Sequence, residues 1–314
     1  MGKDKKVSVY NLAKNKSFLK SIILITIVFI IFPLLFSQTT AGAGDLKAVI
    51  KAGKLRHLGI YYANFVKKNN TGLDVELMQM FAEYLGVKYE FVESNWTDIL
   101  SDLLGKNVKP VGDDNVVLSG KRPVKGDVIA TGFTILPWRR KTVDFSKMTF
   151  PTGIWLIADA SLPVKPITPT GNIQEDIQAT KNLLKGISVL VLKGSCLDPG
   201  IYGLNKTGAK IKLFPPDHNL KEMIPSVMAG VVDTTIMDVP VALIALQRWP
   251  GEIKVIGPVS PKQKMACAFP KTSPNLRRKF NKFLDQCKVD GRYKHLVNKY
   301  YPSVFIYYPH FLKN

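Results

Sequence analysis

Cysteine and histidine are scarce in this chain. Its 314 residues include three cysteines, Cys196, Cys267 and Cys287, and four histidines. Such widely spaced cysteines do not make a disulfide scaffold, and no spacing typical of a structural metal site is present. Two alternatives stay open for the thiols: a bridge between Cys267 and Cys287 with Cys196 free, or three buried thiols. We expect no metal and no cofactor.

Acidic residues are also few. The chain has 24 Asp and Glu against 44 Lys and Arg, for a formal net charge of +20. The basic residues are scattered, with neither an aromatic-interleaved basic stretch nor zinc-finger spacing, so no nucleic-acid partner is expected. The composition favours a packed globular protein with a solvated basic surface, and we expect a monomer with a small-molecule partner.

The first 43 residues resemble a targeting segment. A lysine-rich start precedes an uncharged, mostly apolar run from Ser21 to Phe36, and Ala41-Gly42-Ala43 fits a cleavage site. An uncleaved membrane anchor is the alternative, but the run is shorter than the roughly 20 residues that cross a bilayer. We therefore predict a signal peptide, residues 1–43, cleaved after Ala43, and a periplasmic or extracellular location.

The rest of the chain alternates between strand-like and helix-like patterns, which indicates an α/β fold in two similar halves. The predicted strands are 55–62, 88–93, 127–131, 187–193, 211–214, 233–237 and 252–256. The predicted helices are 74–85, 97–104, 220–229 and 240–248. Strands joined by helices favour parallel sheets, with ligands at the carboxyl ends of the strands.

One segment combines groups that suit a carboxylate. The strand-like run from Val128 to Ala130 breaks at Gly132, and Thr134 and Arg139 follow. A guanidinium presents a planar fork of donors, a hydroxyl adds another, and glycine lets a ligand approach the backbone. The alternative from spacing alone is a strand end with a surface arginine.

This segment resembles the signature of the family 3 extracellular solute-binding proteins, the receptors of amino-acid ABC importers. Gly132, Thr134 and Arg139 fall on the family's carboxylate-binding positions, and Asp144-Phe145-Ser146 matches the residues that usually follow. Leu136 departs from the family, where a second threonine is common. The resemblance implies a bilobal type II periplasmic-binding-protein fold, with two α/β lobes, a two-segment hinge and a ligand cleft between them.

The resemblance also implies domain limits. Residues 44–149 and 264–314 would form lobe 1 and residues 150–263 lobe 2, with the chain crossing near 148–152 and 259–264. Residues 106–125 interrupt the family pattern, and turn residues around their short apolar run predict a β-hairpin. This insertion is either a lid or partner contact at the cleft, or a surface embellishment.

The second half of the implied site neutralises an ammonium group. Asp238 ends a predicted strand before Val239-Pro240, and by itself fits a helix cap. In the family an aspartate in this motif binds the ligand's amino group, so we assign Asp238 that role. Gly194-Ser195 is predicted to be a strand-to-helix turn that favours an anion, which makes Ser195 a second carboxylate contact.

Aromatic residues complete the implied site. In the family, aromatic side chains near the first strand enclose the ligand's side chain, and we select Tyr62, Phe65 and Trp96 for this role. Aromatic residues at strand ends are also common in protein cores, which is the alternative. The family's Pro-Pro-Phe pattern is replaced here by Ala63-Asn64-Phe65.

These features predict an exported receptor, not an enzyme, that captures an amino acid or a related zwitterion or carboxylate for an inner-membrane ABC permease. No histidine falls in a catalytic motif, although Glu93 and Asp98 beside Trp96 are formal acid-base candidates. The alternatives are an exported enzyme on the same fold, resembling cyclohexadienyl dehydratase, and a sensing module with a separate signalling partner.

Overall fold

The computed structural model describes residues 44–111, 114–215, 218, 222–308, 310 and 312. The predicted signal peptide lies outside the described residues. Across the described ranges, no helix is both long enough and apolar enough to span a membrane.

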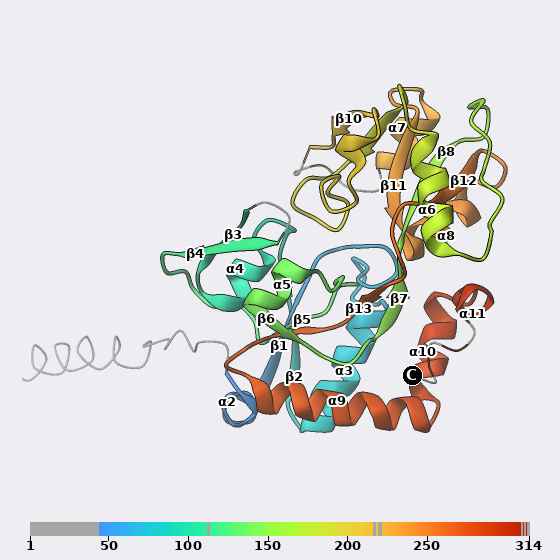
Figure 1. Cartoon of the computed structure of the whole chain (residues 1–314). Coiled ribbons are helices and arrows are strands. Elements are labelled where there is room, and N and C mark those ends of the chain that lie inside the picture. Colours follow the sequence, from blue (N-terminus) through green and yellow to red (C-terminus); the bar gives the residue numbers. More distant parts are fainter. Residues whose placement is uncertain are drawn as a thin grey trace, which may run out of the picture. The chain divides into compact units, whose positions relative to one another are not determined.

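A first sheet has the strand order β2-β1-β5-β14-β6 (Figure 1). Its strands are β1 (Lys54–Gly59), β2 (Lys88–Glu93), β5 (Val128–Ile129), β6 (Val143–Phe145) and β14 (Ala268–Pro270). β1 is parallel to β2 and β5, whereas β14 is antiparallel to β5 and β6. The prediction of a parallel sheet is wrong at this edge because β14 enters without a crossover helix before it.

A second sheet has the order β10-β9-β11-β8-β12. Its strands are β8 (Ile154–Asp159), β9 (Ser188–Val191), β10 (Lys210–Leu213), β11 (Thr234–Asp238) and β12 (Ile253–Pro258). β9 is parallel to β10 and β11, but β8 is antiparallel to β11 and β12. The sequence prediction missed β8. Because β8 is antiparallel to both of its neighbours, this sheet also contains strands of both directions.

Helices follow most of the parallel strands. They are α2 (Leu46–Ala52), α3 (Leu73–Leu85), α4 (Ile99–Leu104), α5 (Pro137–Thr142), α6 (Ile173–Asn182), α7 (Met223–Met228), α8 (Val239–Arg248), α9 (Pro274–Val289), α10 (Arg292–Tyr300) and α11 (Val304–Tyr307). A 3-10 turn, η1 (Leu204–Lys206), lies between β9 and β10. The structure confirms the four predicted helices as α3, α4, α7 and α8, within three residues at each described end.

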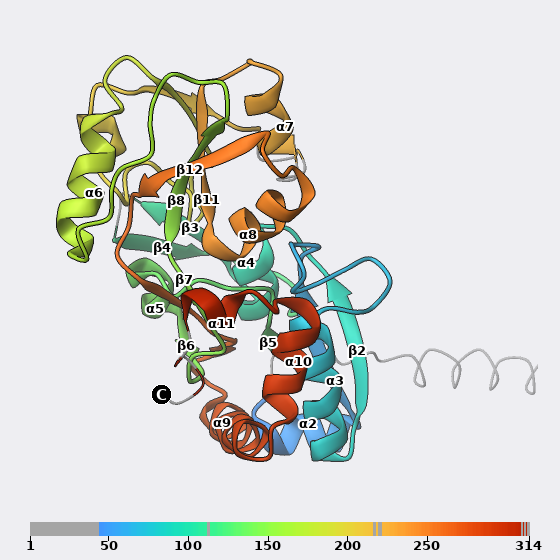
Figure 2. The same cartoon turned by 90° about the vertical axis from the view of Figure 1, so that its right-hand side faces the viewer.

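Aromatic packing holds the carboxyl-terminal half of α3 against α9. The ring of Phe81 in α3 contacts Phe280 and Phe283 of α9 at centroid distances of 5.1 and 5.4 Å. All three rings are fully buried, and Figure 2 shows α3, α9 and α10 packed side by side. The first turn of α3 carries Asp74 and Glu76, which interact favourably with the helix dipole. Asp74 reaches the segment after β5, as described below.

Two short strands connect the sheets. β7 (Phe150–Thr152) and β13 (Gln263–Met265) pair antiparallel, and the chain passes from one sheet to the other through each of them. Thr134 forms an isolated bridge to Met265, so this ladder also contacts the segment after β5.

The cysteines do not form the bridge considered from the sequence. Cys196, Cys267 and Cys287 are all free and buried. Cys267 and Cys287 pack in the apolar core around α3 and α9, where burial raises the pKa of both thiols. They behave as small apolar core residues.

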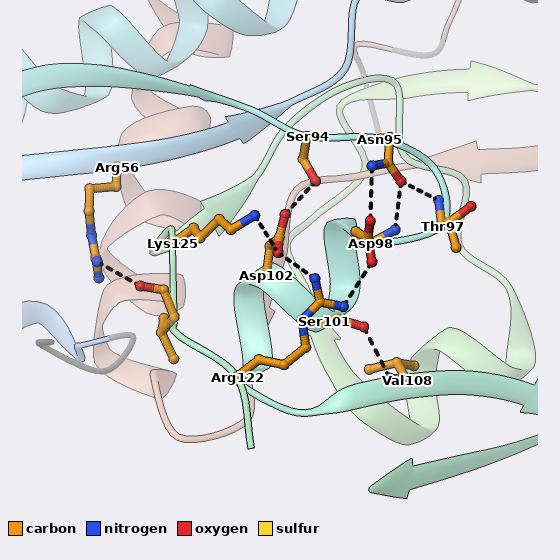
Figure 3. Close-up of polar contacts among 11 residues, drawn as sticks. Arg56, Ser94, Asn95, Thr97, Asp98, Ser101, Asp102, Val108, Arg122 and Lys125 are labelled. Carbon is orange, nitrogen blue, oxygen red and sulfur yellow. Dashed lines mark hydrogen bonds and ion pairs between the residues drawn. The ribbon is translucent and has the colours of Figure 1, made fainter. Parts of the chain in front are cut away.

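The insertion forms the predicted hairpin. β3 (Asn107–Val111) pairs antiparallel with β4 (Asn115–Ser119). The segment that follows the hairpin, residues 120–125, is attached to Asp102 of α4, a residue that is only 1% exposed. Lys125 and Arg122 contact the Asp102 carboxylate at 3.0 and 3.5 Å (Figure 3). Arg122 also binds Asp98 at 2.8 Å, and the Ser101 hydroxyl accepts the Val108 N–H. The hairpin is therefore anchored to α4 at both ends.

Replacing Arg122 with Met should loosen the hairpin without unfolding the protein. Arg122 is partly exposed, so its ion pairs contribute at most about 1 kcal/mol to global stability. We expect faster hydrogen exchange at the β3 and β4 amides and a change in unfolding free energy below about 1 kcal/mol. Arg278→Met, an exposed position in α9, is the control. Unchanged exchange in the hairpin would show that Arg122 does not anchor it.

Candidate functional site

Arg139 is a buried cation with an unused donor. It lies in α5, which begins at Pro137, and is 3% exposed. One guanidinium nitrogen donates to the Thr134 carbonyl at 2.8 Å, and the group lies 3.9 Å from the centre of the Phe133 ring. Its Nε has no hydrogen-bond partner. Burial lowers the pKa of Arg139 to about 10, which still leaves it charged at neutral pH.

Asp238 is a buried anion with an unused acceptor. It ends β11 and is 1% exposed. Its Oδ2 accepts the Tyr62 hydroxyl at 2.5 Å and lies 3.2 Å from the Cys196 sulfur. Its Oδ1 has no partner. The side chain makes no capping bond to α8, so the helix-cap alternative does not hold.

The two charges influence one another. Burial raises the pKa of Asp238, while Tyr62, Cys196 and the charge of Arg139 lower it. Asp238 in turn helps to keep Arg139 charged. Besides Arg139 Nε and Asp238 Oδ1, the Thr134 hydroxyl is buried without a partner. Burying a polar group without a hydrogen-bond partner costs about 1–3 kcal/mol, and more for a charged group. This cluster of unpaired donors and acceptors therefore favours a polar ligand.

Gly132 has a structural partner. Its φ of +61° lies in the left-handed region, and an added Cβ would stand 2.5 Å from the Phe65 ring. Its N–H donates to the buried Asp74 carboxylate at 2.6 Å. The backbone group expected to meet a ligand is thus bound to α3.

The predicted aromatic residues separate into two environments. Phe65 is fully buried and packs against Phe150 and Tyr301, which agrees with the core alternative. Tyr62 is stacked between Phe65 and the edge of Trp96, with centroid distances of 6.2 and 5.3 Å. Only Tyr62 joins the Asp238 cluster directly.

Trp96 lines a cavity beside the insertion hairpin. With Trp138, it lines a cavity of about 220 Å³ whose other walls are Val108–Pro110 of the hairpin and Leu192–Ser195. The insertion therefore reaches the loop after β9.

The predicted strand-to-helix turn at Gly194-Ser195 is not formed. No helix begins here, because the chain continues in turns as far as η1. The Ser195 hydroxyl donates to the Leu192 carbonyl and accepts the Leu197 N–H, while the Asp198 carboxylate accepts the Gly194 N–H. The Gly194 N–H and the Ser195 hydroxyl are thus used within the turn.

Sequence reasoning missed three members of the cluster. They are Cys196, which contacts Asp238 directly, and Tyr202 and Gln263, which reach the cluster through Cys196. The Tyr202 hydroxyl donates to the Cys196 carbonyl at 2.6 Å, and Gln263 donates to that hydroxyl at 3.2 Å. Gln263 Oε1 has no partner. The available signal was the position of Cys196, which directly follows the predicted Ser195 in the sequence.

Comparison with known proteins identifies the class. Residues 117–303 match the bacterial extracellular solute-binding proteins, family 3. The chain belongs to this family, and its fold is the bilobal α/β fold of the family's binding proteins.

Particular relatives include binding proteins and an enzyme. The L-cystine-binding protein TcyJ of Escherichia coli is 23% identical over 74% of each chain. Membrane-bound lytic murein transglycosylase F of Desulfosudis oleivorans is 26% identical over 76% of this chain but only 46% of its own length, so the chain spans about half of that relative.

Solved structures agree on the fold. An ancestral amino acid-binding protein, a precursor of cyclohexadienyl dehydratase, is 27% identical with a TM-score of 0.63, over 82% of this chain and 98% of its own. A mutant of ArgBP from T. maritima has a TM-score of 0.64 at 22% identity, over 82% and 99%.

Proposed function

We propose that this chain is an exported receptor that captures an amino acid or related small zwitterion and delivers it to an inner-membrane ABC importer. One observation carries the proposal: Arg139 and Asp238, of opposite charge, are buried in one cluster, each with an unpaired polar atom. Desolvating such charges costs several kcal/mol unless both find partners. A ligand with both charges supplies them.

The open atoms assign an orientation to the ligand. The carboxylate would accept from Arg139 Nε and the Thr134 hydroxyl, and the ammonium would donate to Asp238 Oδ1. Tyr62 would keep Asp238 in position through its hydroxyl. Leu136, the buried N-cap residue of α5, adds no polar group, so Thr134 supplies the hydroxyl alone.

We assign residues 44–149 and 264–314 to lobe 1 and residues 150–263 to lobe 2. Arg139 and Asp238 then come from opposite lobes, and a zwitterion would favour the closed arrangement through its differential affinity. The receptor would act as a monomer.

A ligand-dependent stability assay tests this function. An amino acid at about 100 times its dissociation constant should add about 2.7 kcal/mol to the unfolding free energy. For each amino acid that does so, the matching amine without a carboxylate should have little effect. The proposal fails if no amino acid shifts the melting temperature, or if the amine binds as well as the zwitterion.

An enzyme on the same fold is the second candidate function, and the contacts of Asp238 favour it. A buried carboxylate with a raised pKa, bound by a tyrosine hydroxyl, has the character of a general acid or base. Burial raises the pKa of the Cys196 thiol, so that thiol is not an activated nucleophile. Asp98 is paired with Arg122 at the hairpin, so it does not support an enzymatic function. Product formation from prephenate or arogenate would establish this function in place of the first.

A further inference from the structure

A larger cavity lies behind Tyr62, apart from the Arg139–Asp238 cluster. Its volume is about 470 Å³, within the range of small-molecule sites. One wall is the loop from Tyr61 to Asn69, after β1, and the other consists of side chains from α7, β11 and α8. Arg139, Thr134 and Asp238 do not line it.

The chemistry of this cavity differs from that of the zwitterion cluster. Its interior is apolar, formed by Val66, Ile224, Met237, Val241 and Ile244, with the Trp249 ring at one side. Val241 and Ile244 are only partly buried, so a ligand would cover apolar surface there.

The rim of the cavity is cationic. Lys67, Lys68 and Arg248 line it and are exposed, and no acidic residue in the described part of the chain does. Among the described residues, these three cations have no ion-pair partner within 4.0 Å. Glu93 lies beside the Tyr61 hydroxyl, outside the lining. An apolar interior with a cationic rim complements a molecule with an apolar body and one acidic group.

The loop that carries this wall is held in an uncommon conformation. Ala63 has a φ of +49°, in the left-handed region that residues with a Cβ rarely adopt. The adjoining Asn64 is fixed by the Tyr301 hydroxyl and the Tyr300 carbonyl. Tyr62 is thereby fixed between the two sites, with its hydroxyl on Asp238 and its ring in the cavity wall.

We propose that this cavity is a second ligand site, which takes an organic carboxylate with an aromatic or branched apolar body. The apolar part packs between Tyr62, Val241 and Trp249, and the carboxylate lies at the rim near Lys68 and Arg248. Tyr62 separates the two sites, so a carboxylate without an ammonium group can bind here independently of the cluster.

Binding of 2-naphthoate to the purified protein tests the site, with calorimetry for affinity and quenching of Trp249 fluorescence for location. We expect saturable binding of one molecule per chain, weaker by about fivefold to thirtyfold in Lys68→Glu/Arg248→Glu, since each exposed charge contributes up to about 1 kcal/mol. The uncharged 2-naphthalenemethanol should bind more weakly than the acid. Trp249→Phe should remove most of the quenching, and Val241→Trp should fill the cavity and abolish binding.

Two controls separate this proposal from the receptor function. Lys206→Glu/Lys212→Glu reverses two exposed charges that do not line the cavity and should leave 2-naphthoate affinity unchanged. Arg139→Met/Asp238→Asn, in which both charges of the cluster are neutralised, should abolish amino-acid binding yet change 2-naphthoate affinity by less than about twofold. The proposal is overturned if no saturable binding occurs, if the alcohol binds as well as the acid, or if the folded double variant Arg139→Met/Asp238→Asn does not bind naphthoate.

Discussion

Arg139→Met should abolish amino-acid binding and lower the unfolding free energy by about 3–5 kcal/mol, because it leaves the Asp238 charge buried without its cation. The guanidinium also loses its bond to the Thr134 carbonyl and its contact with Phe133. Methionine fills much of the same volume, so a cavity does not explain the loss. Chemical denaturation measures the first effect and calorimetry with the preferred amino acid the second.

The double variant Arg139→Met/Asp238→Asn distinguishes stability from binding. Neutralising both charges removes the uncompensated anion, so stability should recover by several kcal/mol while binding stays lost. Arg140→Met is the matched control, since Arg140 is the next residue, is exposed and lies outside the cluster. If Arg139→Met binds the amino acid with wild-type affinity, the zwitterion cluster is not the ligand site.

The regular elements could be predicted where one local pattern decides them. β2 was predicted at its observed bounds, 88–93, because it is a short alternating run between turn residues. α3 was predicted to within one residue because its apolar residues recur at helical spacing and Gly86 ends it with a φ of +70°. β8 was missed because its direction and partners are set by two strands that follow it by 75 residues or more.

The candidate site was predicted only in part. Arg139 and Asp238 could be selected because both fall on motifs that resemble the family's ligand-binding positions, and both are in the buried cluster. Cys196 could not, since its contact with Asp238 spans 42 positions and depends on a turn where a helix was predicted. Phe65 was assigned to the ligand although its neighbours, Phe150 and Tyr301, are far away in the sequence. Tertiary contacts of this kind leave no local signal.

Gly132 shows how a predicted ligand contact can have another partner. The sequence marks the glycine but not Asp74, which lies 58 positions earlier and accepts its N–H. Burial raises the pKa of Asp74 from 3.8 to about 7, while the Gly132 N–H lowers it. The carboxyl therefore binds a proton in the folded protein at pH values where it is ionised in the unfolded chain.

This difference predicts that Asp74 makes the folded protein less stable as pH rises. Between pH 4 and pH 7 the folded state holds the Asp74 proton more tightly, so the contribution of Asp74 to stability is largest at low pH and is lost as pH rises through about 7. Each unit of pKa difference corresponds to about 1.4 kcal/mol, which gives a total of about 4 kcal/mol across this window. Asp74→Asn keeps an acceptor for Gly132 and removes the titration.

The measurement is the difference in unfolding free energy between Asp74→Asn and the wild type, determined by denaturation at pH 4 to 8. It should shift in favour of the variant by roughly 3–4 kcal/mol as pH rises from 4 to 8, because only the wild type must bury an anion at high pH. Other titrating groups, including Asp238, are present in both proteins and cancel. Asp285→Asn, at an exposed carboxylate paired with Lys147, should show less than about 1 kcal/mol of such change. A difference that stays constant over this range would mean that Asp74 is ionised in the folded protein throughout, with Gly132 N–H as sufficient compensation.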